Sequence, residues 1–299
     1  MITFEMTCWE NDYRHILQYD YLRKLFFNIP DNFTHRRLLV NQVISRNHVY
    51  RLAAKCTEFL DEIVFVQDFY NEAFDLYLNG NPFTKMEEQY SRSQFTGLLL
   101  CDTPYLFHLN ADIEVENPDS SNFLEVGIEL LSRRKDSSIS FSPNWAFREL
   151  NGILYGDQGY LLEQVNRFTF QDLPFFECSG FTDNCYLIDK RELTKIDWNC
   201  ESEFTRNYPK YAGQSFERRI ANYMFTNNLS RIVDPAIRFI NTEIPKSNVV
   251  KFLNALINLF GLSTVFFAYE FLELILLNCD GISHTIFYIN NIRFNYSFL

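Results

Sequence analysis

Glycine is scarce in this 299-residue chain, which contains 10 glycines and 9 prolines. Phosphate-binding loops need several glycines at fixed spacing, and neither GxGxxG nor GxxxxGK[ST] occurs. The nucleophile motif GxSxG and the zinc motif HExxH are absent too, so the commonest hydrolase signatures are excluded. Positive charge is also in deficit. With 27 Lys and Arg against 38 Asp and Glu, the net charge of -11 would repel a phosphate backbone, and we expect no nucleic-acid partner.

The seven cysteines are odd in number and include no CxxC pair. This pattern argues against a disulfide-stapled secreted scaffold and against a zinc ribbon, and it predicts reduced, buried thiols. The N-terminal sequence MITFEMTCWENDY has no basic start and no apolar stretch before a cleavage site. We therefore expect a cytoplasmic protein.

Aromatic residues are abundant, with 31 Phe and 17 Tyr, which predicts a core filled by large rings. A polar stretch at 245–247 predicts a domain at 1–245 and a hydrophobic, helical extension at 246–299. No formal charge interrupts 252–269. Because Asn254 and Asn258 share one helical face, an amphipathic or buried helix is expected there. Docking on the cytosolic face of a membrane and a true membrane span are the alternatives.

Short apolar runs alternate with stretches of helical period through the first two thirds of the chain. This alternation predicts an α/β fold, with a mixed, mainly parallel sheet flanked by helices. The expected strands are 2–7, 38–40, 63–66, 105–109 and 185–188. The expected helices are 13–27, 49–60, 91–101, one beginning after Pro118, and 214–226. Segments 140–159 and 168–183 have the composition of binding loops and short antiparallel strands.

Polar side chains close several of the predicted strands. Ligands of parallel sheets bind beyond the carboxyl ends of the strands, so these side chains are candidates for a binding site. They are Thr7, Asn41, Asp68, Asn110 and Asp112. Asp112 is best placed to coordinate a divalent cation that neutralises a diphosphate, because its segment NADIEVE leaves an apolar strand directly. An acidic turn facing water is the alternative.

The order of MTCWEND, RRLLVNQV, DEIVFVQDF and YLFHLNADIEV resembles the nucleotide-sugar half of a GT-A fold glycosyltransferase. The resemblance covers about residues 1–245. It implies that Asp112 holds Mn²⁺ or Mg²⁺ as the last carboxylate of an Asp-x-Asp motif, in which Asn110 replaces the first Asp. It also implies that Thr7 and Trp9 belong to the loop that cups the nucleotide, that Asn41 stands where an Asp often recognises the base, and that Asp68 approaches the nucleoside.

The same resemblance implies a catalytic carboxylate. The segment YAGQSFERRIANYM resembles the helix start that carries it in inverting members, so Glu217 is the expected base. Asp183, in FFECSGFTDNCYLID, is the reserve candidate. The alternative interpretation of Glu217 is a structural one, in which its carboxylate in the first turn of the helix is stabilised by the helix dipole. For His108, inside a predicted strand, a structural imidazole is favoured over a base or a ligand.

The resulting hypothesis is a glycosyltransferase, inverting by expectation, which moves a sugar from a nucleotide diphosphate sugar to a carbohydrate or glycolipid acceptor. The rival hypothesis is a catalytically degenerate protein that keeps the sheet and binds a sugar nucleotide or glycan without turnover. The departures at Asn110 and Asn41 are the main support for this rival. A nucleotidyltransferase is disfavoured because the N-terminal segment lacks a glycine-rich, basic phosphate loop.

Overall fold

The computed structural model describes residues 1–10, 12–43, 45–78, 85–145, 148–150, 152–155, 161–198, 202–203 and 215–242. They belong to the first of two compact units, Met1–Glu243. The predicted extension at 246–299, with its alternatives of docking and spanning, lies outside the described residues. Among the helices that are described, none is long and apolar enough to cross a membrane.

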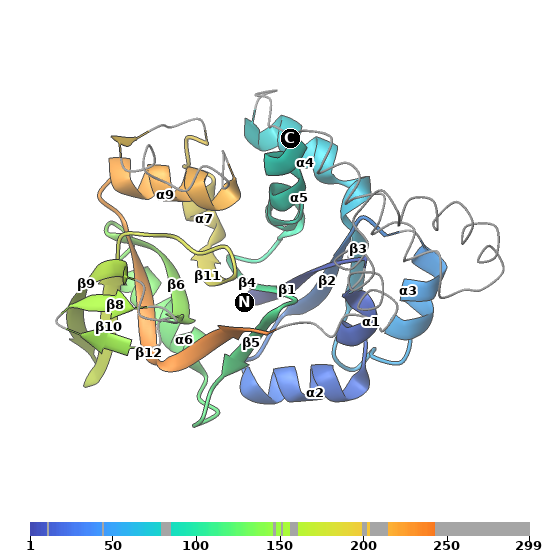
Figure 1. Ribbon diagram of the computed structural model, residues 1–299, viewed down its shortest axis with the longest axis horizontal. Coiled ribbons are helices and arrows are strands. Elements are labelled where there is room, and N and C mark those ends of the chain that lie inside the picture. The colour runs from blue at the N-terminus through green and yellow to red at the C-terminus, as the bar shows by residue number, and fades with distance from the viewer. Residues whose placement is uncertain are drawn as a thin grey trace, which may run out of the picture. The chain divides into compact units, whose positions relative to one another are not determined.

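The described strands form a mixed sheet in the order β3-β2-β1-β4-β11-β6-β12-β10-β9-β8-β7, with β5 beside β12 (Figure 1). Parallel pairing joins β3, β2, β1 and β4, and also β6 and β12, while the other pairs are antiparallel. The strands are β1 (Ile2–Trp9), β2 (His35–Asn41), β3 (Glu62–Phe65), β4 (Tyr105–Asn110), β5 (Ile113–Glu116), β6 (Ser138–Asn144), β7 (Arg148–Leu150), β8 (Ile153–Tyr155), β9 (Leu161–Phe170), β10 (Leu173–Cys178), β11 (Cys185–Asp189) and β12 (Ser230–Asn241).

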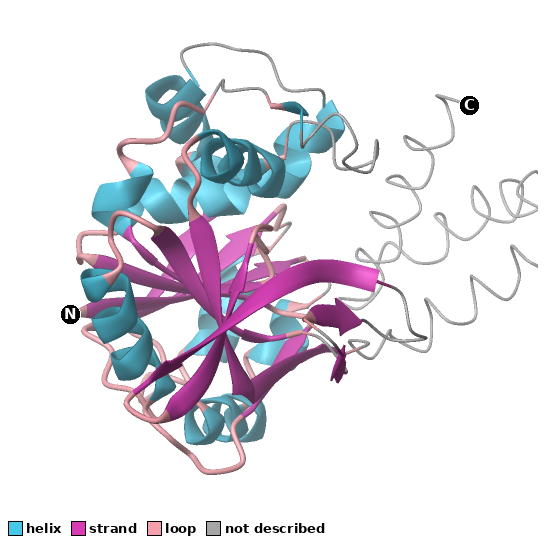
Figure 2. Ribbon diagram, turned by 90° about the vertical axis from the view of Figure 1, so that its left-hand side faces the viewer, coloured by secondary structure: helices cyan, strands magenta, loops and turns pink. Residues whose placement is uncertain are grey.

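Helices cover both faces of this sheet (Figure 2), so the predicted α/β class is confirmed. The described helices are α1 (Tyr13–Ile16), α2 (Tyr19–Asn28), α3 (Arg46–Ala53), η1 (Val66–Asp68), α4 (Tyr70–Leu78), α5 (Lys85–Leu100), α6 (Phe123–Arg133), α7 (Lys190–Leu193) and α9 (Phe216–Thr226). Side chains alternate between the faces along each strand, which sorts them into two cores.

The first core lies between the sheet and helices α2 and α6. The rings of Phe4 and Phe26 are 5.0 Å apart, and those of Phe107 and Phe123 are 6.1 Å apart. All but Phe26 are fully buried, and each buried ring contributes about 1.5–3 kcal/mol. The large number of Phe residues therefore serves the core, as predicted.

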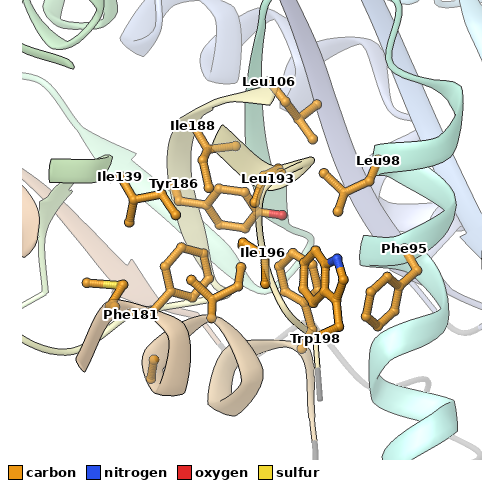
Figure 3. Packing of buried hydrophobic residues seen from close by; sticks show 14 of the residues in the cluster. Phe95, Leu98, Leu106, Ile139, Phe181, Tyr186, Ile188, Leu193, Ile196 and Trp198 are labelled. Atoms are coloured by element: carbon orange, nitrogen blue, oxygen red, sulfur yellow. The ribbon is translucent and has the colours of Figure 1, made fainter. Parts of the chain in front are cut away.

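The second core lies under α5 and α9, on the opposite face (Figure 3). The Trp198 ring lies 5.0 Å from Phe95 and 5.6 Å from Phe216, and Tyr186 and Ile188 of β11 pack into the same cluster. Cys101 also belongs to it. Cys8, Cys56, Cys101, Cys178 and Cys185 are buried and form no disulfide, which confirms the prediction of reduced thiols for these five.

Three expectations about the elements were wrong. The predicted helix at 13–27 is two helices, because Gln18 has an extended backbone at φ -106° and ψ 133°. Apolar residues of both pieces are buried, Ile16 and Leu22 among them, so the apolar pattern continues across the break. The predicted helix at 49–60 ends at Ala53, and turns bring Cys56 and Leu60 into the core. Strand β12 was not predicted, although its Ile232, Val233, Ile237 and Phe239 are buried.

Candidate functional site

Four of the predicted site residues meet at the carboxyl ends of β1, β2 and β4. In the register of the parallel pairs, Thr7 is the partner of Asn110 and Trp9 is the partner of Asn41. The backbone N–H of Ala111 donates to the Thr7 carbonyl at 2.9 Å, which holds the end of β4 against β1. Parallel pairing thus turns three polar strand ends, far apart in the sequence, into one neighbourhood.

Two of these residues keep buried polar atoms without a hydrogen-bond partner in the described part of the chain. They are Thr7, through Oγ1, and Asn41, through both Oδ1 and Nδ2. Thr7 is 5% exposed and Asn41 is fully buried. Because a buried polar group without a partner costs about 1–3 kcal/mol, these atoms are suited to a polar ligand that would satisfy them.

Asp112 lies in the turn between β4 and β5. Its backbone carbonyl accepts hydrogen bonds from the N–H of Thr242 at 2.7 Å and from the Thr242 hydroxyl at 3.2 Å. The residue is exposed, but burial around its carboxyl group raises the pKa of that group above its ordinary value. A carboxylate that is anchored through its backbone and is only partly solvated is suited to serve as a metal ligand.

Asp12 is a member of the site that the sequence analysis missed. Its Oδ2 accepts the Trp9 N–H at 3.1 Å, which folds the loop after β1 back on itself. Burial raises the pKa of Asp12 to about 6, and the negative charge of Asp112 adds to the rise. The only sequence signal was its place in WENDY, directly after the first strand.

Asp183 approaches the same turn from a different segment, the loop between β10 and β11. The Asn110 N–H donates to the Asn184 carbonyl at 2.9 Å, and the Asn110 side-chain Nδ2 donates to Asn184 Oδ1 at 3.0 Å. Burial raises the pKa of Asp183, the positive charge of His108 opposes this rise, and the charge of Asp112 reinforces it. Asp12, Asp112 and Asp183 therefore form an electrostatically linked acidic region, with Asp112 in common.

This region does not form a complete metal site by itself. In the described part of the chain, no group of three or more His, Cys, Asp or Glu side chains is placed to hold one ion. The chemistry of the donors instead fits a cation held by one or two carboxylates together with substrate phosphate oxygens, as is usual for Mg²⁺. The predicted role of Asp112 fits a cation site of this kind, which substrate phosphate completes.

Asp68 and Glu217 have other surroundings. Both carboxylate oxygens of Asp68 accept hydrogen bonds from Arg46, at 2.6 and 2.8 Å, in a surface ion pair. Glu217 is half-buried in the first turn of α9, where a helix dipole favours a carboxylate, and Ser215 caps that helix. Residues 204–214, which lead into this helix, lie outside the described part. The roles of Asp68 and Glu217 stay predictions.

His108 is buried and both of its ring nitrogens have partners, as the structural interpretation predicted. Among the aromatic side chains, Phe175 and Phe176 are buried at 1% and 6% exposure and belong to the core. Trp145 is 40% exposed, and its ring stacks on Phe239 at 6.3 Å.

No family model and no curated protein matches the chain. Among solved structures, the galactosyltransferase LgtC in complex with donor and acceptor sugar analogues is matched at 15% identity and a TM-score of 0.38, over 77% of this chain and 72% of that one. A TarS fragment from S. aureus is matched at 11% identity and a TM-score of 0.41, over 81% and 60%. UDP-glucose pyrophosphorylase complexed with UDP-glucose is matched at 9% identity and a TM-score of 0.41, over 79% and 90%. At such scores, the residues of the site, and not these matches, carry the proposals below.

Proposed function

We propose that this protein is a glycosyltransferase that uses a nucleotide diphosphate sugar. The observation that carries the proposal is the convergence of unpartnered Thr7 and Asn41 with an acidic region around Asp112, at the carboxyl ends of parallel strands. The first feature suits a nucleoside and the second suits a diphosphate with its counter-ion. The resemblance of the sequence to the GT-A fold supports the same conclusion.

The nucleoside would lie against the ends of β1 and β2. A side-chain amide offers one donor and one acceptor side by side, so Asn41 would recognise a base edge with the complementary pair. Thr7 would add one hydroxyl contact, and Trp9 would lie beside the nucleoside. The contacts of Thr7 and Asn41 would satisfy polar atoms that have no partner in the described part of the protein. The contact of Trp9 would cover a ring that is only partly buried.

The diphosphate would lie toward Asp112. A divalent cation such as Mn²⁺ or Mg²⁺, when bound between Asp112 and the phosphate oxygens, would neutralise charge on the leaving nucleoside diphosphate. The negative charge of Asp112 disfavours ionisation of Asp12 through like-charge repulsion, and a cation bound there would relieve this repulsion. Asn110 would direct the turn that carries Asp112 and would not itself hold the ion.

An inverting transfer needs one base to accept the proton of the attacking acceptor hydroxyl. Two carboxylates are candidates. Asp183 has a raised pKa and shares the acidic region with Asp112, which suits a proton acceptor close to the donor sugar. Glu217 is supported by the resemblance and by its position at the start of α9. We propose Asp183 as the first candidate of the two, supported by its electrostatic link to Asp112.

A transfer assay with purified protein tests the proposal and separates the two bases. Release of nucleoside diphosphate would be measured over a panel of nucleotide sugars, with carbohydrate and glycolipid acceptors. Asp112→Asn and Asp183→Asn should each lower kcat at least 100-fold while leaving the unfolding transition intact. If Glu217→Gln alone abolishes transfer and Asp183→Asn does not, Glu217 is the base.

The rival function, binding of a sugar nucleotide or glycan without turnover, is favoured by one observation, Asn110 in the place of a carboxylate. It predicts saturable binding of nucleoside diphosphates with no release from any nucleotide sugar. Membrane docking through 252–269 is a separate proposal. Fractionation of the intact protein and of a 1–245 variant without detergent tests it, and identical distributions would contradict docking.

A further inference from the structure

A row of charged and polar side chains crosses the buried face of the sheet at a single register. Arg37 on β2 is the register partner of Glu5 on β1. On the other side, His108 of β4 is the partner of Glu5, and it is in turn the partner of Tyr186 on β11. These strands lie next to one another in the sheet (Figure 1). The row leads from β2 toward the loop that carries Asp183.

The first part of the row is a closed network. The Glu5 carboxylate accepts from Arg37 Nε at 3.0 Å and Nη2 at 2.7 Å through one oxygen, and its other oxygen lies 2.8 Å from His108 Nδ1. Glu5 and His108 are fully buried and Arg37 is 1% exposed. Burial opposes ionisation of Glu5, but Arg37 and His108 together outweigh it and lower the pKa of the carboxyl group. Glu5 is therefore an anion inside the protein.

The second part connects His108 to the candidate site. Its Nε2 lies 3.1 Å from Asn110 Oδ1, and the Nδ2 of the same amide donates to Asn184 Oδ1 at 3.0 Å. The His108 ring is also fixed by stacking on Tyr186, with centroids 4.9 Å apart and planes at 14°. Each side-chain atom of Asn110 that can hydrogen-bond is thus used to join the core to the turn at 183–184.

Hydrogen-bond accounting gives the proton positions on His108. An ionised carboxylate only accepts, so Nδ1–H donates to Glu5, and the amide oxygen of Asn110 also only accepts, so Nε2–H donates as well. The ring is then an imidazolium. The charged groups around it are Glu5, Arg37 and Asp183, and Asp183 in turn interacts with Asp112. Burial raises the pKa of the Tyr186 hydroxyl well above its ordinary value, so that group is neutral. Within the row, the positive charges of Arg37 and His108 both lie against the Glu5 carboxylate, and the Asp183 carboxyl lies beyond the row near His108.

We propose that Arg37, Glu5 and His108 form a relay that fixes the Asn110 amide and, through it, the turn bearing Asp183, with a proton on each ring nitrogen of His108. His108 is then a positioning residue. The claim that the turn serves sugar transfer rests on the function proposed above, whereas the claim about the relay does not. Asn110 in place of a carboxylate is then an adaptation, because an amide can accept from His108 and donate to Asn184 at once, whereas an ionised carboxylate can only accept.

Nitrogen-15 NMR of the histidine side chains tests the relay without any substrate. At pH 7.5, both ring nitrogens of His108 should show shifts and attached protons of the protonated form. The half-buried His35, which lies 3.1 Å from Glu62 and outside the row, is the matched control. Glu5→Gln should remove the second proton from His108 and leave His35 unchanged. An unprotonated Nε2 in the wild type would overturn the assignment, since the two amides would then have the opposite orientation.

Two variants test the positioning role, and the milder one leaves the core intact. His108→Gln removes the positive charge that lowers the pKa of Asp183, so the Asp183 carboxyl, followed by carbon-13 NMR, should titrate at higher pH. Asn184→Ala breaks only the last link, and should shift the Asn110 side-chain amide resonance while leaving the protonation of His108 unchanged. No change at Asp183 and Asn110 in either variant would overturn the relay.

Activity then separates this inference from the proposed function. Asn184→Ala should lower kcat about 10-fold with the KM for donor changed less than 2-fold, and His35→Asn should change neither. Absence of transfer in the wild type, with the NMR results as expected, would reject the proposed function and leave the relay standing. Normal transfer by Asn184→Ala, with a displaced Asn110 amide, would reject the positioning role alone.

Discussion

The carboxylate of Glu5 lies directly against Gly97 of α5, where a Cβ atom on the glycine would collide with the carboxyl group. The backbone carbonyl of Gly97 also accepts a hydrogen bond from Arg37 Nη2. A helix without a side chain at this one position therefore allows the sheet to keep an ion pair in its core. This contact anchors the polar row that leads to the candidate site.

Gly97→Ala should destabilise the protein by about 1–3 kcal/mol, because the added methyl group overpacks a rigid, charged neighbour. It should also disturb the protonation of His108, because Glu5 must move. Gly127→Ala is the matched control, since its Cβ would collide with the Phe141 ring on the other face of the sheet. Urea unfolding should show a loss for both, while the His108 resonances should move only in Gly97→Ala. If the His108 resonances moved in both variants, the change at His108 would not be specific to the contact between Gly97 and Glu5.

Glu5→Gln should cost about 3–5 kcal/mol of unfolding free energy, because it leaves the Arg37 charge buried without a counter-ion. Asp68→Asn breaks an equally short ion pair with Arg46 at the surface and should change stability little, because water solvates both partners. Chemical denaturation of the two variants side by side measures the contrast. Equal losses would contradict the assignment of Glu5 as the buried anion of the core.

Asp12 predicts a pH dependence of stability with a definite sign. Its pKa is raised from 3.8 to about 6, chiefly by burial, so the folded state binds its proton more tightly than the unfolded state does. This contribution is fully present below pH 3.8 and is lost as the pH rises to about 6. Asp12→Asn removes this contribution. The unfolding free energy at pH 7, relative to that at pH 4, should therefore be higher in the variant than in the wild type. No change in that difference would show that Asp12 is solvated.

Much of the fold was predictable from local patterns. Apolar runs in the sequence predict strands β1 to β4. Helix α6 is predicted by the helical spacing of its apolar residues, among which Phe123, Leu124, Leu130 and Leu131 are buried. The break between α1 and α2 was not predictable, because Gln18 carries no breaker signal and the apolar period continues through it. Strand β12 was missed because Asp234 and Pro235 interrupt its apolar run, at the place where its register with β6 shifts.

The candidate site was predictable only in part. Thr7, Asn41, Asn110 and Asp112 follow apolar runs, so their meeting at one sheet edge follows from parallel pairing. Glu5, Arg37 and Gly97 carry no such signal, since a charged residue within a strand usually faces water. Their partnership depends on the register of two strands and on the position of one helix, which local sequence does not encode. Asp12 and Asn184 likewise enter the site through loop geometry.

Thr7→Val and Asn41→Leu should each weaken binding of nucleoside diphosphates at least 10-fold, because each removes polar atoms that the protein leaves unpartnered. Both variants should be as stable as the wild type or more so without ligand, since they bury no orphan polar group. Calorimetric titration and thermal unfolding measure the two effects. Loss of stability without loss of binding would assign these residues to the core alone.

The central claim is that Asp112 binds a nucleoside diphosphate through a divalent cation. Thermal unfolding with a panel of nucleoside diphosphates, with and without Mn²⁺, in wild type and Asp112→Asn tests it directly, because a ligand that binds the folded state raises the midpoint. The account predicts that at least one nucleoside diphosphate raises Tm in the wild type, more with Mn²⁺ than without, and that Asp112→Asn removes the Mn²⁺-dependent part. An equal response of the two proteins to every nucleotide and to Mn²⁺ would contradict it.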